Sequence, residues 1–193
     1  MGKVVFVMSM SLDGFVAGPN IRLEEPMGEG GMVLHDWISD TSDPRNQEVL
    51  TQGISSIGAV ITGRGTYDTS LQGWGAHGPT GDARVPVFVV SHSKPSDVPA
   101  NSVYTFADSI ESALSQARAT TGTKDMTVMG GANIAQQFFK ANLIDEIEIQ
   151  LIPVILNGGL RLFEHIGSEQ IKLENVKAVQ TAAATHLHFR VVK

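Results

Sequence analysis

The sequence contains no cysteine, which excludes disulfide bonds, thiolate metal sites and cysteine nucleophiles together. It also lacks any apolar run approaching the roughly 18 residues that a membrane-spanning helix needs. The first fifteen residues hold one lysine, a short apolar run and then Asp13, which is too short a core for a signal peptide. We therefore expect a cytoplasmic protein with no membrane partner.

Positive charge is scarce, because 14 Lys and Arg residues face 20 Asp and Glu residues and leave a net charge of −6. Such a chain has no basic surface for nucleic acid. A phosphate ligand remains possible, since a single arginine and a helix N-terminus can bind it. The six histidines show no H-x-x-x-H pair. We expect no metal site, and we expect His186 and His188 to be solvated on one strand face.

The chain of 193 residues, 42% hydrophobic and 18% charged, has the length and composition of a single globular domain spanning 1–193. Valine-rich apolar runs predict buried strands. Strict alternation at 146–151 predicts a strand with one face in water, followed by two antiparallel strands. The predicted strands are 4–8, 58–62, 85–90, 102–105, 126–129, 146–151, 171–179 and 184–192. Helices are predicted to begin after Asp43, at a capping box over 108–111, and after Gly131. This order indicates a mixed sheet with helices on both faces.

Three of these strands, 58–62, 85–90 and 126–129, end in glycine or small polar residues. In open α/β sheets, ligands lie outside the carboxyl ends of parallel strands. Three such junctions suit a long ligand with several phosphates, such as a dinucleotide. The G-x-G-x-x-G fingerprint and the Walker loop are both absent, which disfavours the usual dinucleotide-binding and P-loop folds.

Five stretches, read in order, resemble a known family: VVFVMSMSLDGFVA, ITGRGTY, VFVVSHS, VMGGANIAQQF and IPVILNGGLRLF. The chain resembles the dihydrofolate reductase-like superfamily, and most closely the stand-alone relatives of the riboflavin-biosynthesis reductase domain. The resemblance implies a three-layer α/β/α sandwich with a mixed, mostly parallel central sheet and antiparallel C-terminal strands. It also implies NADPH as the hydride donor.

The resemblance assigns fourteen residues to the cofactor. They are Val16, Ala17, Gly63, Arg64, Gly65, Thr66, Ser91, His92, Ser93, Gly130, Gly131, Ala132, Asn133 and Ile134. Arg64 would meet the 2′-phosphate and Thr66 a pyrophosphate oxygen. The segment 130–134 would hold the pyrophosphate at a helix N-terminus, and Ala17 would lie near the nicotinamide. The alternative for Arg64 is a solvated turn residue.

Asp13 is the candidate catalytic residue, because the resemblance places it near the substrate pocket. A carboxylate there would orient a polar substrate or relay a proton. The alternative is an Asp-Gly turn whose carboxylate only caps backbone N–H groups. Trp74 is either a stacking platform or rim packing, and the Asp36-Trp37 pair resembles the acidic site of dihydrofolate reductases only superficially.

The chain departs from the bifunctional riboflavin enzyme, because the zinc deaminase signature needs cysteines that this chain lacks, and we therefore expect the reductase part alone. A phosphosugar would need basic residues, for which only Arg84 and Arg161 are candidates outside the cofactor motif. We expect an NADPH-dependent reductase acting on a small heterocycle, carbonyl or imine, such as a riboflavin-pathway pyrimidine or a pterin-like ring. The alternative is a non-catalytic NADP- or small-molecule-binding protein. The family and the alternating C-terminal strands also suggest a homodimer.

Overall fold

The computed structural model describes residues 2–193 and contains one large mixed sheet and one strand pair. The strands are β1 (Val4–Ser11), β2 (Phe15–Ala17), β3 (Ile57–Gly63), β4 (Val87–Val90), β5 (Tyr104–Ala107), β6 (Asp125–Val128), β7 (Glu146–Ile152), β8 (Leu160–Arg161), β9 (Leu173–Gln180) and β10 (Thr185–Val191). The helices are η1 (Gly31–His35), α1 (Asp36–Ser39), α2 (Pro44–Ser56), α3 (Arg64–Trp74), η2 (Gly81–Ala83), α4 (Ile110–Thr121) and α5 (Ala132–Lys140).

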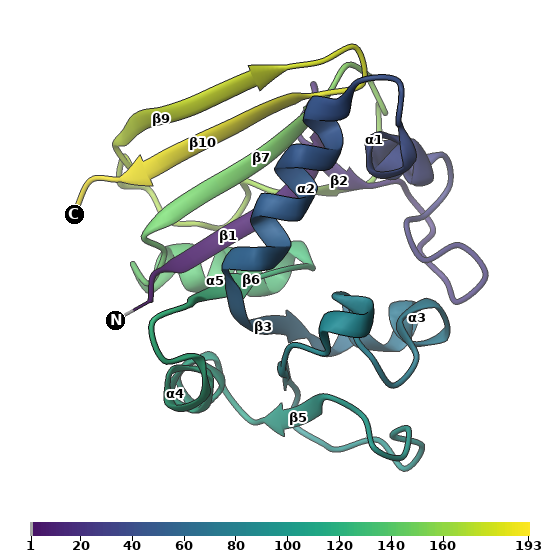
Figure 1. Ribbon diagram of the computed structural model, residues 1–193, viewed down its shortest axis with the longest axis vertical. Helices are drawn as coiled ribbons and strands as arrows, with labels where there is room; N and C mark the ends of the chain where they lie inside the picture. The colour runs from purple at the N-terminus through teal and green to yellow at the C-terminus, as the bar shows by residue number, and fades with distance from the viewer. Residues whose placement is uncertain (1) are drawn as a thin grey trace.

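The large sheet has the strand order β5-β4-β3-β6-β1-β7-β10-β9, and β2 pairs separately with β8. The first six strands run parallel to one another, whereas β10 is antiparallel to both β7 and β9. Figure 1 shows the two last strands, in yellow, completing one edge of the sheet. The predicted mixed sheet with antiparallel C-terminal strands is therefore confirmed.

Helices α4 and α5 pack on one face of the sheet over the largest apolar core, which includes Phe6, Met126 and Phe138. The other face carries α3, over a smaller cluster around Tyr67, and the α1 region, around Trp37. Burying apolar side chains on both faces explains why the strands are valine-rich runs. The result is a three-layer sandwich, as the sequence predicts.

Helix α2 begins as predicted, because the Asp43 side chain accepts a hydrogen bond from the backbone N–H of Arg45 and Pro44 occupies the first turn. Its packing is unusual, since Asn46 is its one buried residue. Figure 1 shows α2 lying in front of the sheet. Its apolar residues Leu50 and Ile54 line a cleft between the helix and the strands.

Some predicted boundaries shift. The capping box at 108–111 is wrong by one residue, because Ser109 is the N-cap and its hydroxyl accepts from Ser112 N–H at 3.2 Å. Helix α3 continues to Trp74, and the residues that follow it include the short helix η2. Within residues 2–193, no helix is long and apolar enough to cross a membrane.

Candidate active site

A single cleft of about 1710 Å³ runs along the carboxyl ends of the parallel strands and continues beneath α2. All fourteen residues assigned to the cofactor from the sequence line it. They come from four segments that are far apart in the chain. Three of these segments follow the parallel strands β3, β4 and β6, which end at one edge of the sheet, and the fourth lies on β2. The loop at 18–30, between β2 and η1, adds Leu23 and Met27 to the lining.

The β3–α3 and β6–α5 junctions are hydrogen-bonded to each other. The Gly63 N–H donates to the Gly130 carbonyl at 3.2 Å, and the Thr62 hydroxyl donates to the same oxygen at 3.0 Å. The Gly130–Gly131 peptide bond is cis, and Gly130 has a φ of 53°. A Cβ added at Gly130 would lie 3.2 Å from the Thr66 side chain. Glycine therefore keeps the backbone open to a ligand beside the Thr66 hydroxyl.

Arg64 is held across the gap between the β3 and β4 junctions. Its Nε donates to Asp68 at 2.7 Å, and its Nη1 donates to the Ser93 carbonyl at 3.1 Å and lies 3.4 Å from the Ser91 hydroxyl. Its Nη2 has no hydrogen-bond acceptor within residues 2–193. The guanidinium is anchored and still offers a free donor edge, which is the geometry a phosphate needs. A freely solvated turn residue would lack these contacts.

The carboxylate of Asp13 is occupied by its own surroundings. It accepts from the backbone N–H groups of Leu156 at 3.1 Å and Asn157 at 2.9 Å, and from the Ser11 hydroxyl at 2.6 Å. The Ser11 hydrogen bond, with the backbone donors, lowers the Asp13 pKa to about 2. Asp13 does not line the cleft. These contacts match the backbone-capping alternative, and a catalytic role stays a prediction.

The remaining candidates separate into two groups. Trp74 lines the cleft and also packs against the apolar cluster around Tyr67. Asp36, Arg84 and Arg161 do not line the cleft. Arg161 instead stacks over the Phe15 ring at 4.4 Å. The two basic residues considered for a phosphosugar therefore lie outside the cavity.

The face of β7 predicted to be in water is covered by α2, so that prediction is wrong for two of its three residues. Glu146 is 5% exposed and Gln150 is 4% exposed, with Glu148 between them partly buried. All three line the cleft. Strand alternation predicts which residues share a face, but it does not reveal what covers that face.

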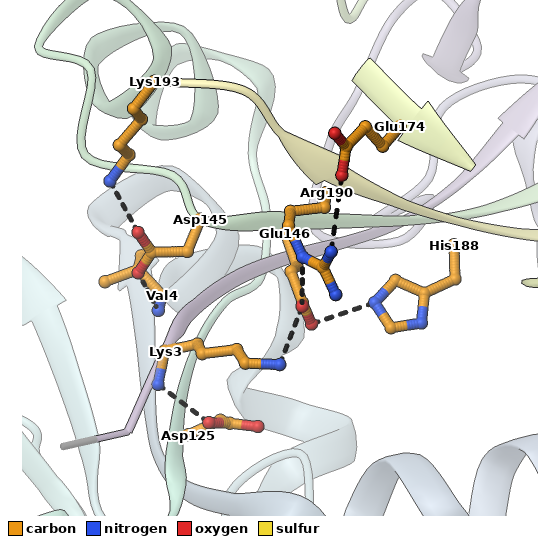
Figure 2. A network of polar contacts seen from close by, with 9 residues as sticks. All are labelled: Lys3, Val4, Asp125, Asp145, Glu146, Glu174, His188, Arg190 and Lys193. Carbon is orange, nitrogen blue, oxygen red and sulfur yellow. Dashed lines mark hydrogen bonds and ion pairs between the residues drawn. The ribbon is translucent and has the colours of Figure 1, made fainter. Parts of the chain in front are cut away.

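Glu146 forms the centre of a charged network at one end of this face (Figure 2). Lys3 Nζ donates to it at 2.7 Å, His188 Nε2 lies at 2.9 Å, and Arg190 Nε lies at 3.9 Å. Burial acts to raise the pKa of Glu146, but the hydrogen bonds from Lys3 and His188 outweigh it and leave the pKa below its ordinary value. Glu146 is thus an ionised, fully partnered carboxylate.

A row of polar side chains crosses the sheet at the other end of the same face. Ser9 pairs with Gln150 in register, and Gln150 pairs with His186. The Trp37 indole donates to the Ser9 hydroxyl at 2.9 Å, and its ring centroid lies 4.9 Å from that of His186. Each of these four side chains is at most 6% exposed and lines the cleft. Sequence reasoning missed this row.

His186 was expected in solvent, and the structure corrects this. It is 6% exposed, and its Nε2 lies 3.0 Å from the Asn46 Oδ1. Because the Asn46 amide nitrogen donates to Asp40 at 2.9 Å, its oxygen accepts from His186 Nε2–H. Burial lowers the pKa of His186 and keeps the ring neutral. Its Nδ1 is then a buried acceptor without a partner among residues 2–193. His188, by contrast, is partly exposed and paired with Glu146.

Within residues 2–193, no group of three or more histidine or acidic residues is arranged to hold a metal ion. The parallel sheet, the glycine junctions at its edge and the cleft are features of a dihydrofolate reductase-like fold, which three solved structures share. The chain belongs to the RibD C-terminal domain family, whose model matches residues 2–187.

Two relatives from Bacillus subtilis (strain 168) match most of the chain. The uncharacterized protein YwjB is 27% identical over 188 residues, covering 97% of each chain. The uncharacterized protein YyaP is 26% identical over 184 residues, covering 90% of this chain and 86% of its own. Both similarities span most of the sequence.

Three solved structures share the fold. A putative riboflavin biosynthesis protein from Shewanella sp. PV-4 has a TM-score of 0.72 and 21% identity, with 99% of each chain covered. The diaminohydroxyphosphoribosylaminopyrimidine deaminase/5-amino-6-(5-phosphoribosylamino)uracil reductase of Thermotoga maritima has a TM-score of 0.68 and 17% identity, covering 99% of this chain and 57% of its own. Dihydrofolate reductase from Enterococcus faecalis, complexed with NADP(H) and RAB-propyl, has a TM-score of 0.62 and 15% identity, covering 100% and 98%. The dihydrofolate reductase-like fold is therefore confirmed.

Proposed function

We propose that this protein is an NADPH-dependent reductase that transfers a hydride to a small heterocyclic, carbonyl or imine substrate. The observation that carries the proposal is the convergence of fourteen residues, from four separate segments, on one cleft. Family membership and the NADP(H) complex of a protein with the same fold support the choice of cofactor. NADPH supplies the hydride when it is bound.

The chain's own residues suit this cofactor at three points. The Arg64 guanidinium is anchored at the β4 junction through the Ser93 carbonyl, beside the Ser91 hydroxyl, and its remaining donor edge would hold the 2′-phosphate. The N-terminus of α5 begins at Ala132, directly after the glycine pair, and offers unpaired N–H groups to the pyrophosphate. Ala17, 5% exposed on β2, leaves room for a flat ring near the sheet.

A fluorescence titration with NADPH and, separately, NADH tests the cofactor assignment. We expect NADPH to bind preferentially, and Arg64→Ala to weaken NADPH by about 10- to 100-fold, since a hydrogen bond to a charged group contributes roughly 1.5–3 kcal/mol. Arg118→Ala is the matched control, because Arg118 is an exposed arginine on α4 outside the cleft. If both variants weaken NADPH binding equally, the effect comes from the net charge of the protein and Arg64 is not a cofactor-binding residue.

A non-catalytic NADP-binding protein on the same fold is the competing function. The two differ in one measurement, which is NADPH oxidation in the presence of a bound ring. The hydrogen bonds that the Asp13 carboxylate accepts from the backbone favour neither the reductase nor the binding protein. A hydride can be transferred without a protein acid when solvent supplies the proton.

We also propose a homodimer. Strand β9 is an eight-residue edge strand, and all of its residues except Val179 are exposed. Val176 and Leu173 are each 44% exposed. A long exposed edge strand with apolar side chains is a surface that pairs readily. Light scattering on a sized sample should give about twice 20.6 kDa, and a particle of 20.6 kDa would rule the dimer out.

A further inference from the structure

The cleft beneath α2 contains polar groups that the protein itself leaves without partners. The Gln150 side chain is 4% exposed and lines the cleft, yet its amide makes no hydrogen bond to any residue of 2–193. Glu148, one strand step away on the same face, likewise makes no hydrogen bond or ion pair there. Both side chains therefore face the cleft, where a ligand or water completes their hydrogen bonds.

Gln150 and Glu148 do not belong to the charged network beside them. In that network the two carboxylate oxygens of Glu146 are hydrogen-bonded to Lys3 and His188, as Figure 2 shows. Burial raises the pKa of Glu148, and the neighbouring carboxylates Glu146 and Asp125 act in the same direction, while His188 and Lys177 oppose them. The neighbouring side chains therefore do not offset the cost of burying the Glu148 carboxylate. A hydrogen-bond donor in the cleft would offset it.

We call the part of the cleft between α2 and the strands the slot, and the polar strand side chains that line it its floor. Leu50, Gly53 and Ile54 of α2 line the same part of the cleft. Residues two apart on a strand lie about 7 Å from each other, so Glu148 and Gln150 span the width of a fused heterocycle. A flat ring with a polar edge satisfies both surfaces at once.

The chemistry of the floor specifies that polar edge. A glutamine amide offers one acceptor and a donor side by side, which complements a lactam edge, –NH–C(=O)–. A carboxylate accepts from an N–H group. Across the row, the free Nδ1 of His186 is one more acceptor. Acceptors outnumber donors on this floor, so it suits a ring that carries N–H groups.

The charges of the slot disfavour a phosphate. Its lining includes Asp125, Glu146 and Glu148, against the two lysines Lys3 and Lys177. Lys3 is already paired with Glu146 at 2.7 Å. A phosphate monoester carries nearly two negative charges at neutral pH and would meet an excess of carboxylates in partly desolvated surroundings.

We propose that Gln150 and Glu148 determine substrate specificity at this site, and that they select an unphosphorylated ring bearing a lactam edge. Calling the ring a substrate rests on the proposed reductase function, in which the ring lies in the same cleft as the cofactor. Ring recognition itself can be measured independently of the cofactor.

Calorimetric titrations with lumazine, riboflavin and riboflavin 5′-phosphate, each with and without NADP⁺, test the inference. The last two probes share one ring system and differ by a phosphate. We expect lumazine or riboflavin to bind, and riboflavin 5′-phosphate to bind more weakly than riboflavin. Gln150→Leu should weaken the bound ring about tenfold or more, because the lactam edge is then left unpaired in the slot. Glu148→Gln should weaken it less, since an amide still offers an acceptor.

Matched controls separate recognition from folding. Gln180→Leu makes the same exchange at an exposed position of β9, and Glu48→Gln removes the same charge from the exposed side of α2. Neither should change ring binding. Gln150→Leu should leave the melting temperature unchanged or raise it, because the Gln150 amide makes no hydrogen bond to any residue of 2–193 that the exchange would break. Gln150→Glu provides a second folded variant, which should lose the lactam complement by replacing the donor.

Three results would overturn the inference: no binding of lumazine or riboflavin, equal ring affinity in wild type and Gln150→Leu, or tighter binding of the 5′-phosphate than of riboflavin. The cofactor assignment fails separately, by absence of NADPH binding to the wild type. If ring binding depends on Gln150 but the protein does not bind NADPH, the ring site is supported and the proposed reductase function is wrong.

Discussion

The two halves of the cleft are built on different principles. The cofactor half is formed by strand ends, glycines and a helix N-terminus, with Arg64 as its one anchored cation. The α2 half is formed by side chains that project from the strands themselves, where Glu146, Gln150 and His186 are nearly buried. Backbone features recognise what many ligands share, such as phosphates. Side-chain floors recognise what distinguishes one ring from another.

The comparison predicts that the halves respond differently to substitution. Changes in the α2 half at its charged end should affect stability without affecting NADPH. Changes at the glycine junction should affect NADPH beyond their effect on stability.

Glu146→Gln should have the largest effect on stability. It leaves Lys3, His188 and Arg190 facing a neutral amide, and we expect the free energy of unfolding to fall by roughly 1–3 kcal/mol. Urea unfolding measures it. Glu174→Gln, which removes an exposed partner of Arg190, should cost about 0.5 kcal/mol or less. NADPH affinity should be unchanged in both variants. A loss of NADPH affinity in Glu146→Gln alone would contradict the independence of the two halves of the cleft.

Gly130→Ala tests the cofactor half. The new Cβ would sit at a φ of 53° and 3.2 Å from Thr66, so we expect a loss of about 1–2 kcal/mol in stability and at least tenfold in NADPH affinity. Gly122→Ala is the matched variant, because Gly122 has a φ of 60° at the end of α4 with no heavy atom within 4 Å of its added Cβ. It should show the strain without the binding loss. Equal NADPH affinity in all three proteins would contradict the junction as a binding site.

The pH dependence of stability should separate buried histidine from carboxylates. Burial lowers the pKa of His186, and of His35, below the ordinary value of 6.5, so the unfolded chain binds protons more readily. Stability is then complete above pH 6.5 and falls as the pH drops below it. His186→Gln should flatten part of this slope in thermal scans between pH 7 and about 5. An unchanged slope would assign the effect to His35.

Asp13→Ala should have the smallest effect on the cleft. Its pKa of about 2 means that the ionised carboxylate supports the fold above the ordinary value of 3.8 and loses this support as the pH falls through 2. The variant should melt earlier at neutral pH, lose the extra acid sensitivity, and bind NADPH normally. If turnover disappears while melting and NADPH binding stay as in wild type, Asp13 is catalytic and the capping account is wrong.

Prediction from sequence succeeded where local chemistry determines structure. The strand runs, the Asp43-Pro44 helix start and the glycine junctions are local patterns, and the parallel topology then places the junctions at one edge. The predicted cofactor residues share one cleft for that reason, although their binding role stays a prediction.

Prediction was weak where packing decides. The alternation at 146–151 correctly grouped Glu146, Glu148 and Gln150 on one face, but the covering position of α2 depends on the tertiary fold. His186 was misplaced for the same reason. Its partner Asn46 is 140 residues away in the chain, and no local signal joins them.

The most direct test of the whole account is NADPH oxidation by the wild-type protein with lumazine or riboflavin present. The account predicts that a ring bound beneath α2 oxidises NADPH held at the strand ends, and that Gln150→Leu slows this while leaving NADPH affinity intact. Tight binding of both molecules with no oxidation above the rate in buffer would contradict the reductase and leave a binding protein.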